Sequence, residues 1–108
     1  LDCHSMSSEI VSEGTDIVIS NNRNKSANPV ITNILQKLFE SYGYKVNINN
    51  PFKGGFITKY YGRPVNHVNV IQIEINKKLY LFEENFNIDT KNFNKLKNCF
   101  SIYFWPSF

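Results

Sequence analysis

Val70-Ile71-Gln72-Ile73-Glu74-Ile75-Asn76 completes the run that begins at Val68, and this run decides the fold. A nearly continuous series of Val and Ile is typical of a strand in the middle of a sheet that is covered on both sides. Because side chains alternate along a strand, residues 71, 73 and 75 face one way, and Gln72, Glu74 and Asn76 share the other face. The sequence therefore predicts a central strand that carries a carboxylate in its interior.

The segments around this strand alternate between strand and helix patterns. Residues 15–20 form a short apolar run typical of a buried strand, and residues 44–49 alternate as in a strand with one buried face. Between them, Asn28, Pro29 and Gly43 bracket apolar residues at three- and four-residue spacing, which predicts a helix. Residues 56–61 fit a short helical turn, and residues 90–102 fit a second long helix. This order of elements predicts an α/β fold.

Composition excludes several classes of protein. The 108 residues suffice for one domain, and 42% hydrophobic residues argue against disorder. The net charge of +3 comes from scattered basic residues, so we expect no nucleic-acid partner, and no apolar run is long enough for a transmembrane helix. Cys3 and Cys99 form neither a disulfide framework nor a zinc ribbon, which favours a reducing, cytoplasmic location.

Two positions are candidates for catalytic chemistry. A buried carboxylate at Glu74 would have a raised pKa, in the range useful for a general base. The alternative is a strand whose second face lines solvent or meets a lysine. Asp2 and His4 share one face of an extended segment, and a carboxylate beside an imidazole fixes its tautomer, as partners of metal-binding histidines do. The alternative is a strand end whose histidine makes an ordinary hydrogen bond.

The remaining candidates lie in loops. Arg63 precedes the central strand and could clamp a substrate carboxylate through its planar guanidinium, although a solvated loop arginine is the simpler interpretation. Gly54-Gly55 marks a sharp turn or a close approach of the backbone, but it lacks the known phosphate-binding patterns. If the first residues are extended, Cys3 points away from the His4 face, and we expect it in the core.

Several motifs occur in one order over nearly all of residues 1–85, and together they resemble the N-formylglutamate amidohydrolase family. They are Asp2-Cys3-His4-Ser5-Met6, Asp16-Ile17-Val18, Asn50-Pro51-Phe52-Lys53-Gly54-Gly55-Phe56-Ile57-Thr58, Tyr61-Gly62-Arg63-Pro64 and Ile71-Gln72-Ile73-Glu74-Ile75-Asn76-Lys77-Lys78-Leu79-Tyr80. The family is similar in fold to zinc carboxypeptidases and the aspartoacylase group. The resemblance therefore implies part of a three-layer sandwich, with a mixed central sheet flanked by helices.

The resemblance also implies an activity, the hydrolysis of N-formyl-L-glutamate to formate and L-glutamate in histidine degradation. In such enzymes a zinc ion activates water and polarises the amide carbonyl. His4 matches a zinc-binding histidine with Asp2 as its supporting carboxylate, and Glu74 matches the general base or acid. Four further residues in the shared motifs are expected to bind the substrate, an N-acyl amino acid: Gly54, Gly55, Thr58 and Arg63.

One departure from the family pattern concerns the metal. The family's other zinc ligands, a histidine and an acidic residue, come from an earlier segment that residues 1–108 do not contain. We therefore expect these residues to be the C-terminal part of a single α/β domain. Alone they would have an incomplete Zn²⁺ ligand set and no activity, and their partner would be the N-terminal segment. The alternative is an inactive remnant of the family with a structural or interaction role.

Overall fold

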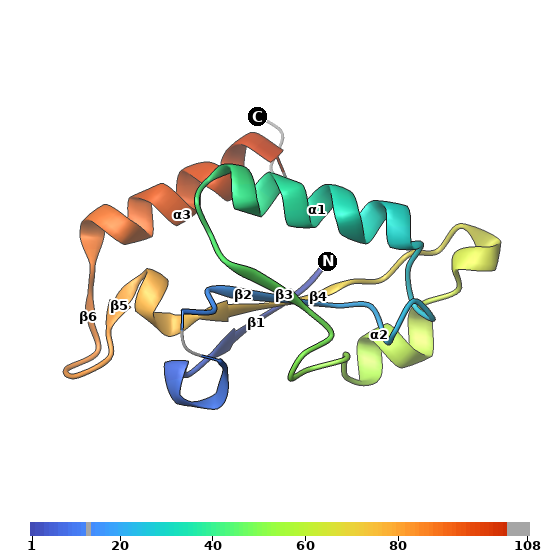
Figure 1. Cartoon of the computed structure of the whole chain (residues 1–108), viewed down its shortest axis with the longest axis horizontal. Helices are drawn as coiled ribbons and strands as arrows, with labels where there is room; N and C mark the ends of the chain where they lie inside the picture. The colour runs from blue at the N-terminus through green and yellow to red at the C-terminus, as the bar shows by residue number, and fades with distance from the viewer. Residues whose placement is uncertain (13, 104–108) are drawn as a thin grey trace.

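A computed structural model describes residues 1–12 and 14–103, and a four-stranded mixed sheet lies at its centre (Figure 1). The strands β1 (Asp2–Met6), β2 (Ile17–Ser20), β3 (Val46–Ile48) and β4 (Gln72–Asn76) have the order β1-β4-β2-β3. Strand β4 pairs parallel with β1 and antiparallel with β2, and β2 pairs parallel with β3. The predicted α/β class and the central position of the strand around Glu74 are both confirmed.

Strand β4 begins later than the apolar run predicts. Val68 instead forms an isolated bridge with Arg63, and the N–H of Val70 donates to the carbonyl of Ser26 over 2.9 Å. These contacts hold the first part of the run outside the sheet. The strand therefore begins at Gln72, beside the start of β1.

Two long helices, α1 (Pro29–Ser41) and α3 (Thr90–Tyr103), cover one face of the sheet (Figure 1). The start of α1 is confirmed, because the Asn28 side chain accepts a hydrogen bond from the N–H of Val30. Its end is confirmed by Gly43, which has a φ of 85°. The core between the sheet and these helices is formed by Ile17, Ile19, Ala27, Leu35, Phe39, Tyr44, Ile71, Ile73, Leu96 and Cys99.

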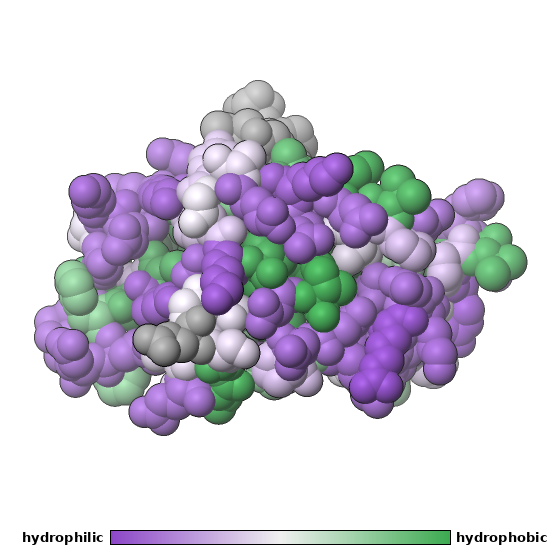
Figure 2. Space-filling model, viewed as in Figure 1, coloured by the Kyte–Doolittle hydropathy of each residue, from purple (hydrophilic) through white to green (hydrophobic). Residues whose placement is uncertain are grey.

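The apolar stripe of α1 is wider than the part that the fold buries. Leu35 and Phe39 are buried, whereas Val30 and Ile34 are 62% and 54% exposed. Only the sector with Leu35 and Phe39 faces the sheet, so Val30 and Ile34 remain exposed. Figure 2 shows hydrophobic patches among the hydrophilic residues that dominate one face of the molecule.

The opposite face of the sheet carries only short elements within the described residues. They are α2 (Phe56–Tyr61) and the 3-10 turn η1 (Ser8–Ile10), which lie below the sheet in Figure 1. The complete second helical layer of a three-layer sandwich is therefore not seen in residues 1–12 and 14–103. No helix in this part of the chain combines the length and apolar character that crossing a membrane requires.

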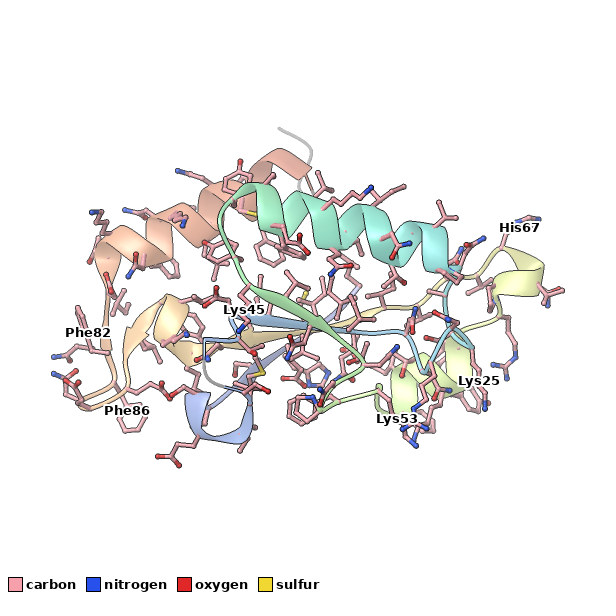
Figure 3. The ribbon with its side chains drawn as sticks, in the orientation of Figure 1. Lys25, Lys45, Lys53, His67, Phe82 and Phe86 are labelled. Carbon is pink, nitrogen blue, oxygen red and sulfur yellow. The ribbon has the colours of Figure 1, made fainter. Side chains whose placement is uncertain are left out.

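The segment that follows β4 connects the sheet to α3. It contains the 3-10 turn η3 (Lys77–Leu79) and a hairpin formed by β5 (Leu81–Phe82) and β6 (Asn87–Ile88). Another 3-10 turn, η2 (Pro64–Asn66), lies on the other side of β4 in the sequence, between α2 and β4. Figure 3 shows Phe82 and Phe86 at the hairpin, at the end of the molecule far from α2. The Glu83 carboxylate binds Ser7 and Ser8, so the hairpin also fixes the chain just after β1.

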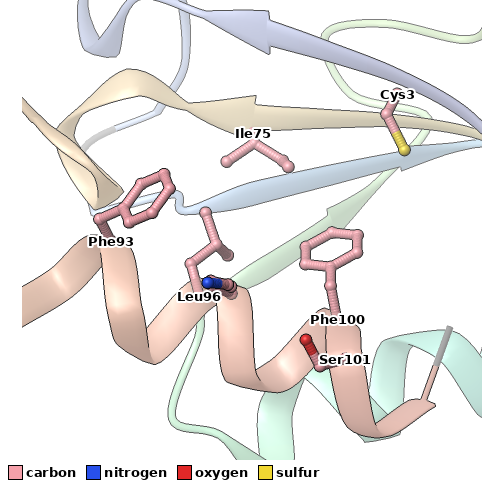
Figure 4. A pocket seen from close by; sticks show the side chains of 7 residues that line it. Cys3, Ile75, Phe93, Leu96, Phe100 and Ser101 are labelled. Carbon is pink, nitrogen blue, oxygen red and sulfur yellow. The ribbon is translucent and has the colours of Figure 1, made fainter. Parts of the chain in front are cut away.

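The sequence predicts Cys3 in the core, and this prediction is wrong. Its side chain does point away from the His4 face, but it is exposed and lines an apolar cavity of about 490 Å³ beside α3 (Figure 4). Ile75 from β4 and Phe93 and Phe100 from α3 line the same cavity. The prediction fails because β1 is an edge strand of the described sheet, so no neighbouring strand covers Cys3 from the other side.

Candidate active site

The register between β1 and β4 creates the candidate site. In this parallel pair Asp2 lies opposite Gln72, and His4 lies opposite Glu74. All four side chains project from the sheet face that is turned away from α1 and α3, because residues two apart on a strand share a face. Two segments far apart in the sequence thus bring the predicted catalytic residues together.

Asp2, His4 and Glu74 form a row of carboxylate, imidazole and carboxylate. His4 Nε2 lies 2.9 Å from Asp2 Oδ2, and His4 Nδ1 lies 3.8 Å from Glu74 Oε1. The side chain of His4 is 46% exposed, whereas those of Asp2 and Glu74 are 18% and 9% exposed. The imidazole is therefore accessible from solvent while both carboxylates that flank it are largely covered.

Burial determines the protonation behaviour of Glu74. Loss of solvent raises the pKa of its carboxyl above the ordinary value, and the nearby Asp2 carboxylate adds to this rise. The imidazole of His4 and a hydrogen bond from Gln72 act in the opposite direction on the same pKa. A raised pKa makes this carboxylate a better proton acceptor than an exposed glutamate, which suits the role of a general base.

The loop after β3 forms the wall of a cleft in front of these residues. The cleft has a volume of about 390 Å³ and is lined by His4, Pro51, Phe52, Lys53, Gly54, Gly55, Gln72 and Glu74. Two hydrogen bonds anchor the loop: the Ser20 hydroxyl donates to the carbonyl of Phe52 over 2.6 Å, and the N–H of Asn22 donates to the carbonyl of Lys53 over 2.6 Å. Figure 3 shows Lys53 on the side of the sheet away from α1 and α3, and Lys53 is one of the residues that line the cleft.

Thr58 supports the glycine turn of this loop from behind. It is fully buried, and its hydroxyl donates to the carbonyl of Gly55 over 2.8 Å. Gly54 has a φ of 119°, and a Cβ atom there would collide with the Thr58 side chain. The turn therefore needs glycine at position 54, and Thr58 does not line the cleft of His4 and Glu74.

Arg63 also lies away from this cleft. Its guanidinium donates to the carbonyl of Gly62 over 2.6 Å and to that of Lys59 over 3.3 Å. It lines a separate groove of about 590 Å³ together with Lys25 and Lys59. The structure thus brings His4, Asp2, Glu74, Gly54 and Gly55 together, and it places Thr58 and Arg63 outside the cleft.

The donor atoms of the site do not complete a metal centre. Within residues 1–12 and 14–103, no group of three or more His, Cys, Asp or Glu side chains is arranged to hold a metal ion. His4 Nε2 is engaged by Asp2, which leaves one imidazole nitrogen and the Glu74 carboxylate as donors facing each other. Catalytic zinc sites use three protein ligands and keep one position open. The described residues therefore supply at most part of a zinc site.

Two polar residues of the cleft, Gln72 and Lys53, have no role assigned from the sequence. Gln72 shares a strand face with Glu74, and this alternation was the signal that could have identified it. Its amide contacts both Glu74 and the backbone of Gly55. Lys53 lies in an irregular loop, where side-chain direction follows from turn geometry, so no pattern in the sequence could have placed it.

Comparisons with known proteins agree on one family. The sequence model of N-formylglutamate amidohydrolase matches residues 1–81. N-formylglutamate deformylases from Pseudomonas putida and Pseudomonas aeruginosa are 39% identical over 59 residues and 33% identical over 70 residues, covering 54% and 64% of this chain. The crystal structure of N-formylglutamate amidohydrolase from Ralstonia eutropha JMP134 superimposes on 93% of this chain with a TM-score of 0.83 and 26% identity. The matches span 22% and 26% of the two curated relatives and 38% of the solved chain.

Proposed function

Because the chain belongs to the N-formylglutamate amidohydrolase family, we propose that it contributes to the active site of a hydrolase that cleaves N-formyl-L-glutamate into formate and L-glutamate. The observation that carries this proposal is the row of Asp2, His4 and Glu74 beside an open cleft. A small amino acid derivative suits a cleft of about 390 Å³ whose lining includes the basic residue Lys53.

In this proposal Glu74 moves the proton of the reaction. Its carboxylate accepts a proton from a water molecule as the water oxygen forms a bond to the formyl carbon. The bond between carbon and nitrogen then breaks, and Glu74 returns the proton to the departing amine, so that formate and L-glutamate result. A raised pKa suits this role, because the group must hold the proton between the two steps.

The proposal includes zinc, which when bound would activate the water and polarise the formyl carbonyl. His4 would be one ligand, and Asp2 would hold its ring in the required tautomer and orientation. The remaining ligands would come from a segment outside these 108 residues, which is the N-terminal partner that we expect. Gly54 and Gly55 would contact the substrate, while Thr58 would act by supporting their turn.

The test is formate release by this chain combined with the complementary segment of the family, supplied with zinc and N-formyl-L-glutamate. We expect activity in the wild-type pair, and a loss of about 10²- to 10⁴-fold in Glu74→Gln, the range typical of a general base. His4→Ala should lose both zinc and activity. The matched control is His67→Ala, because His67 is an exposed histidine that does not line the cleft. A well-folded pair that binds zinc but releases no formate would contradict the proposal.

The incomplete donor set favours a second candidate, an inactive remnant of the family that keeps the fold for a structural or interaction role. Elemental analysis of the purified chain and of the pair separates the two. A catalytic part takes up stoichiometric zinc in the pair and loses it in His4→Ala. A remnant folds with the segment but holds no zinc in either form.

A further inference from the structure

Gln72 connects the loop of the cleft to the candidate general base. Its Oε1 accepts a hydrogen bond from the N–H of Gly55 over 2.9 Å, and its Nε2 donates to Glu74 Oε1 over 3.0 Å. Gln72 is only 5% exposed, so both bonds form in a largely desolvated place. The reaction proposed above assigns no step to this residue.

The two bonds fix the direction of the Glu74 carboxylate. Because an amide is planar, a side chain that is held at both its oxygen and its nitrogen cannot rotate without losing a bond. Glu74 Oε1 is directed at Gln72 Nε2 and lies 3.8 Å from His4 Nδ1. Glu74 Oε2 has no hydrogen-bond partner among the described residues, so it is the oxygen left for a molecule in the cleft.

The same amide is also bonded to the loop, through the N–H of Gly55. Gly55 lies at the start of α2 and has no side chain of its own to cap the helix. The loop is anchored elsewhere to Ser20 and Asn22, but its contact with Gln72 is the one that leads to Glu74. A shift of Gly55 would therefore turn the amide of Gln72, and with it the carboxylate that this amide holds.

We infer that Gln72 is a positioning residue, which couples the Gly54–Gly55 turn to the direction in which Glu74 presents its free oxygen. The catalytic consequence rests on the proposed function, whereas the coupling itself is a property of this chain. Substrate that moves the turn would also realign the base, so binding and proton transfer would be linked through one side chain.

The coupling is tested by amide hydrogen exchange at Gly55 in the 108-residue chain, measured by NMR. Gln72→Met should raise the exchange rate about tenfold, since one hydrogen bond of ordinary strength is lost. Glu74→Leu should also raise it, because Gln72 loses its anchor, whereas Glu74→Gln keeps an acceptor oxygen and should preserve the wild-type rate. The double variant Gln72→Met/Glu74→Leu should exchange no faster than Gln72→Met alone.

The matched control is Asn76→Leu, because Asn76 is a buried amide on the same face of β4 that bonds to the Thr15 carbonyl instead. It should leave the exchange at Gly55 unchanged. Gln72→Asn, which is too short to span both partners, replaces Gln72→Met if the latter does not fold. A folded Glu74→Leu chain with wild-type exchange at Gly55 overturns the inference.

The assembled enzyme gives an independent measurement. Gln72→Met should lower kcat about a hundredfold with little change in KM, as expected when a catalytic group is misdirected by about 1 Å. If the wild-type pair releases no formate, the proposed function fails while the exchange data still decide the coupling. If the wild-type pair is active and Gln72→Met keeps its kcat, the positioning role is refuted.

Discussion

Replacing Gly62 by alanine tests how tightly α2 is packed against the rest of the domain. Gly62 has φ −68° and ψ 121°, a conformation that any residue adopts, so backbone strain does not require glycine there. The lack of space does require glycine. A Cβ atom at position 62 would lie 2.5 Å from Ser26 Cβ, 2.6 Å from Ser26 Cα and 2.7 Å from the Thr58 carbonyl oxygen. Two of these three atoms belong to the backbone and cannot rotate away.

Two effects of opposite sign determine how much Gly62→Ala changes the free energy of unfolding. Alanine restricts the unfolded chain and would stabilise the fold by about 0.4–1 kcal/mol if it fitted. Overpacking costs about 1–3 kcal/mol, and contact with backbone atoms argues for the upper part of this range. We expect a net loss of about 2 kcal/mol in the free energy of unfolding. At about 4 °C per kcal/mol for a domain of this size, the Tm of Gly62→Ala falls by about 8 °C.

The assay is thermal unfolding followed by circular dichroism, with Gly55→Ala as the matched control. A Cβ atom on Gly55 meets nothing closer than Gln72 Oε1 at 3.4 Å, and its φ of −98° suits alanine. The Tm of this control should stay within about 2 °C of wild type, as is usual for substitutions without steric conflict. A Tm for Gly62→Ala at or above that of wild type would refute the reasoning, because Ser26 could then not lie in close contact with Gly62.

Three further substitutions probe the core, the candidate base and a helix start. Phe39→Ala removes a fully buried ring whose centroid lies 5.6 Å from that of the Phe100 ring, and urea unfolding should show a loss of about 3–5 kcal/mol in the free energy of unfolding. A loss below about 1 kcal/mol would contradict this packing. Because the pKa of Glu74 is raised, the folded chain binds more protons than the unfolded chain, so stability falls as the pH rises above 4.5. When urea midpoints are compared across pH, Glu74→Gln should lack this fall. If the midpoints of wild type and Glu74→Gln changed in parallel with pH, the raised pKa of Glu74 would be ruled out. Asn28→Ala removes the cap on the N–H of Val30 and should cost about 1 kcal/mol in urea unfolding, whereas Asn28→Ser should cost little; equal stability of both variants would argue against the cap.

The alternation along β4 was enough to predict which of its side chains share a face. That property depends only on the two-residue period of a strand, and Ile73 does lie in the core while Glu74 lies on the other side of the sheet. The partner of Glu74 could not be predicted in the same way. Its proximity to His4 follows from the pairing of β1 with β4, and no local pattern specifies a contact between segments so far apart.

The loop residues show the limit of arguing from shared motifs. The resemblance implies that Thr58 and Arg63 bind the substrate, and the structure adds that Thr58 turns inward to Gly55 and that Arg63 binds the carbonyl of Gly62. The direction of such side chains follows from turn geometry and from available backbone carbonyls, which periodicity does not encode. For the same reason the exposure of Cys3 could not be predicted, because it depends on what lies beyond the edge of β1.

The alternation of β4 also has an evolutionary consequence. A deletion of one residue between Arg63 and Gln72 that moved the strand by one register position would bring Glu74 under the helices and Ile73 into the cleft. Such a change would bury an unpaired charge and damage the fold and the site together. Selection for folding alone therefore keeps the register that holds Glu74 in the cleft, even in a gene copy whose product no longer turns over substrate.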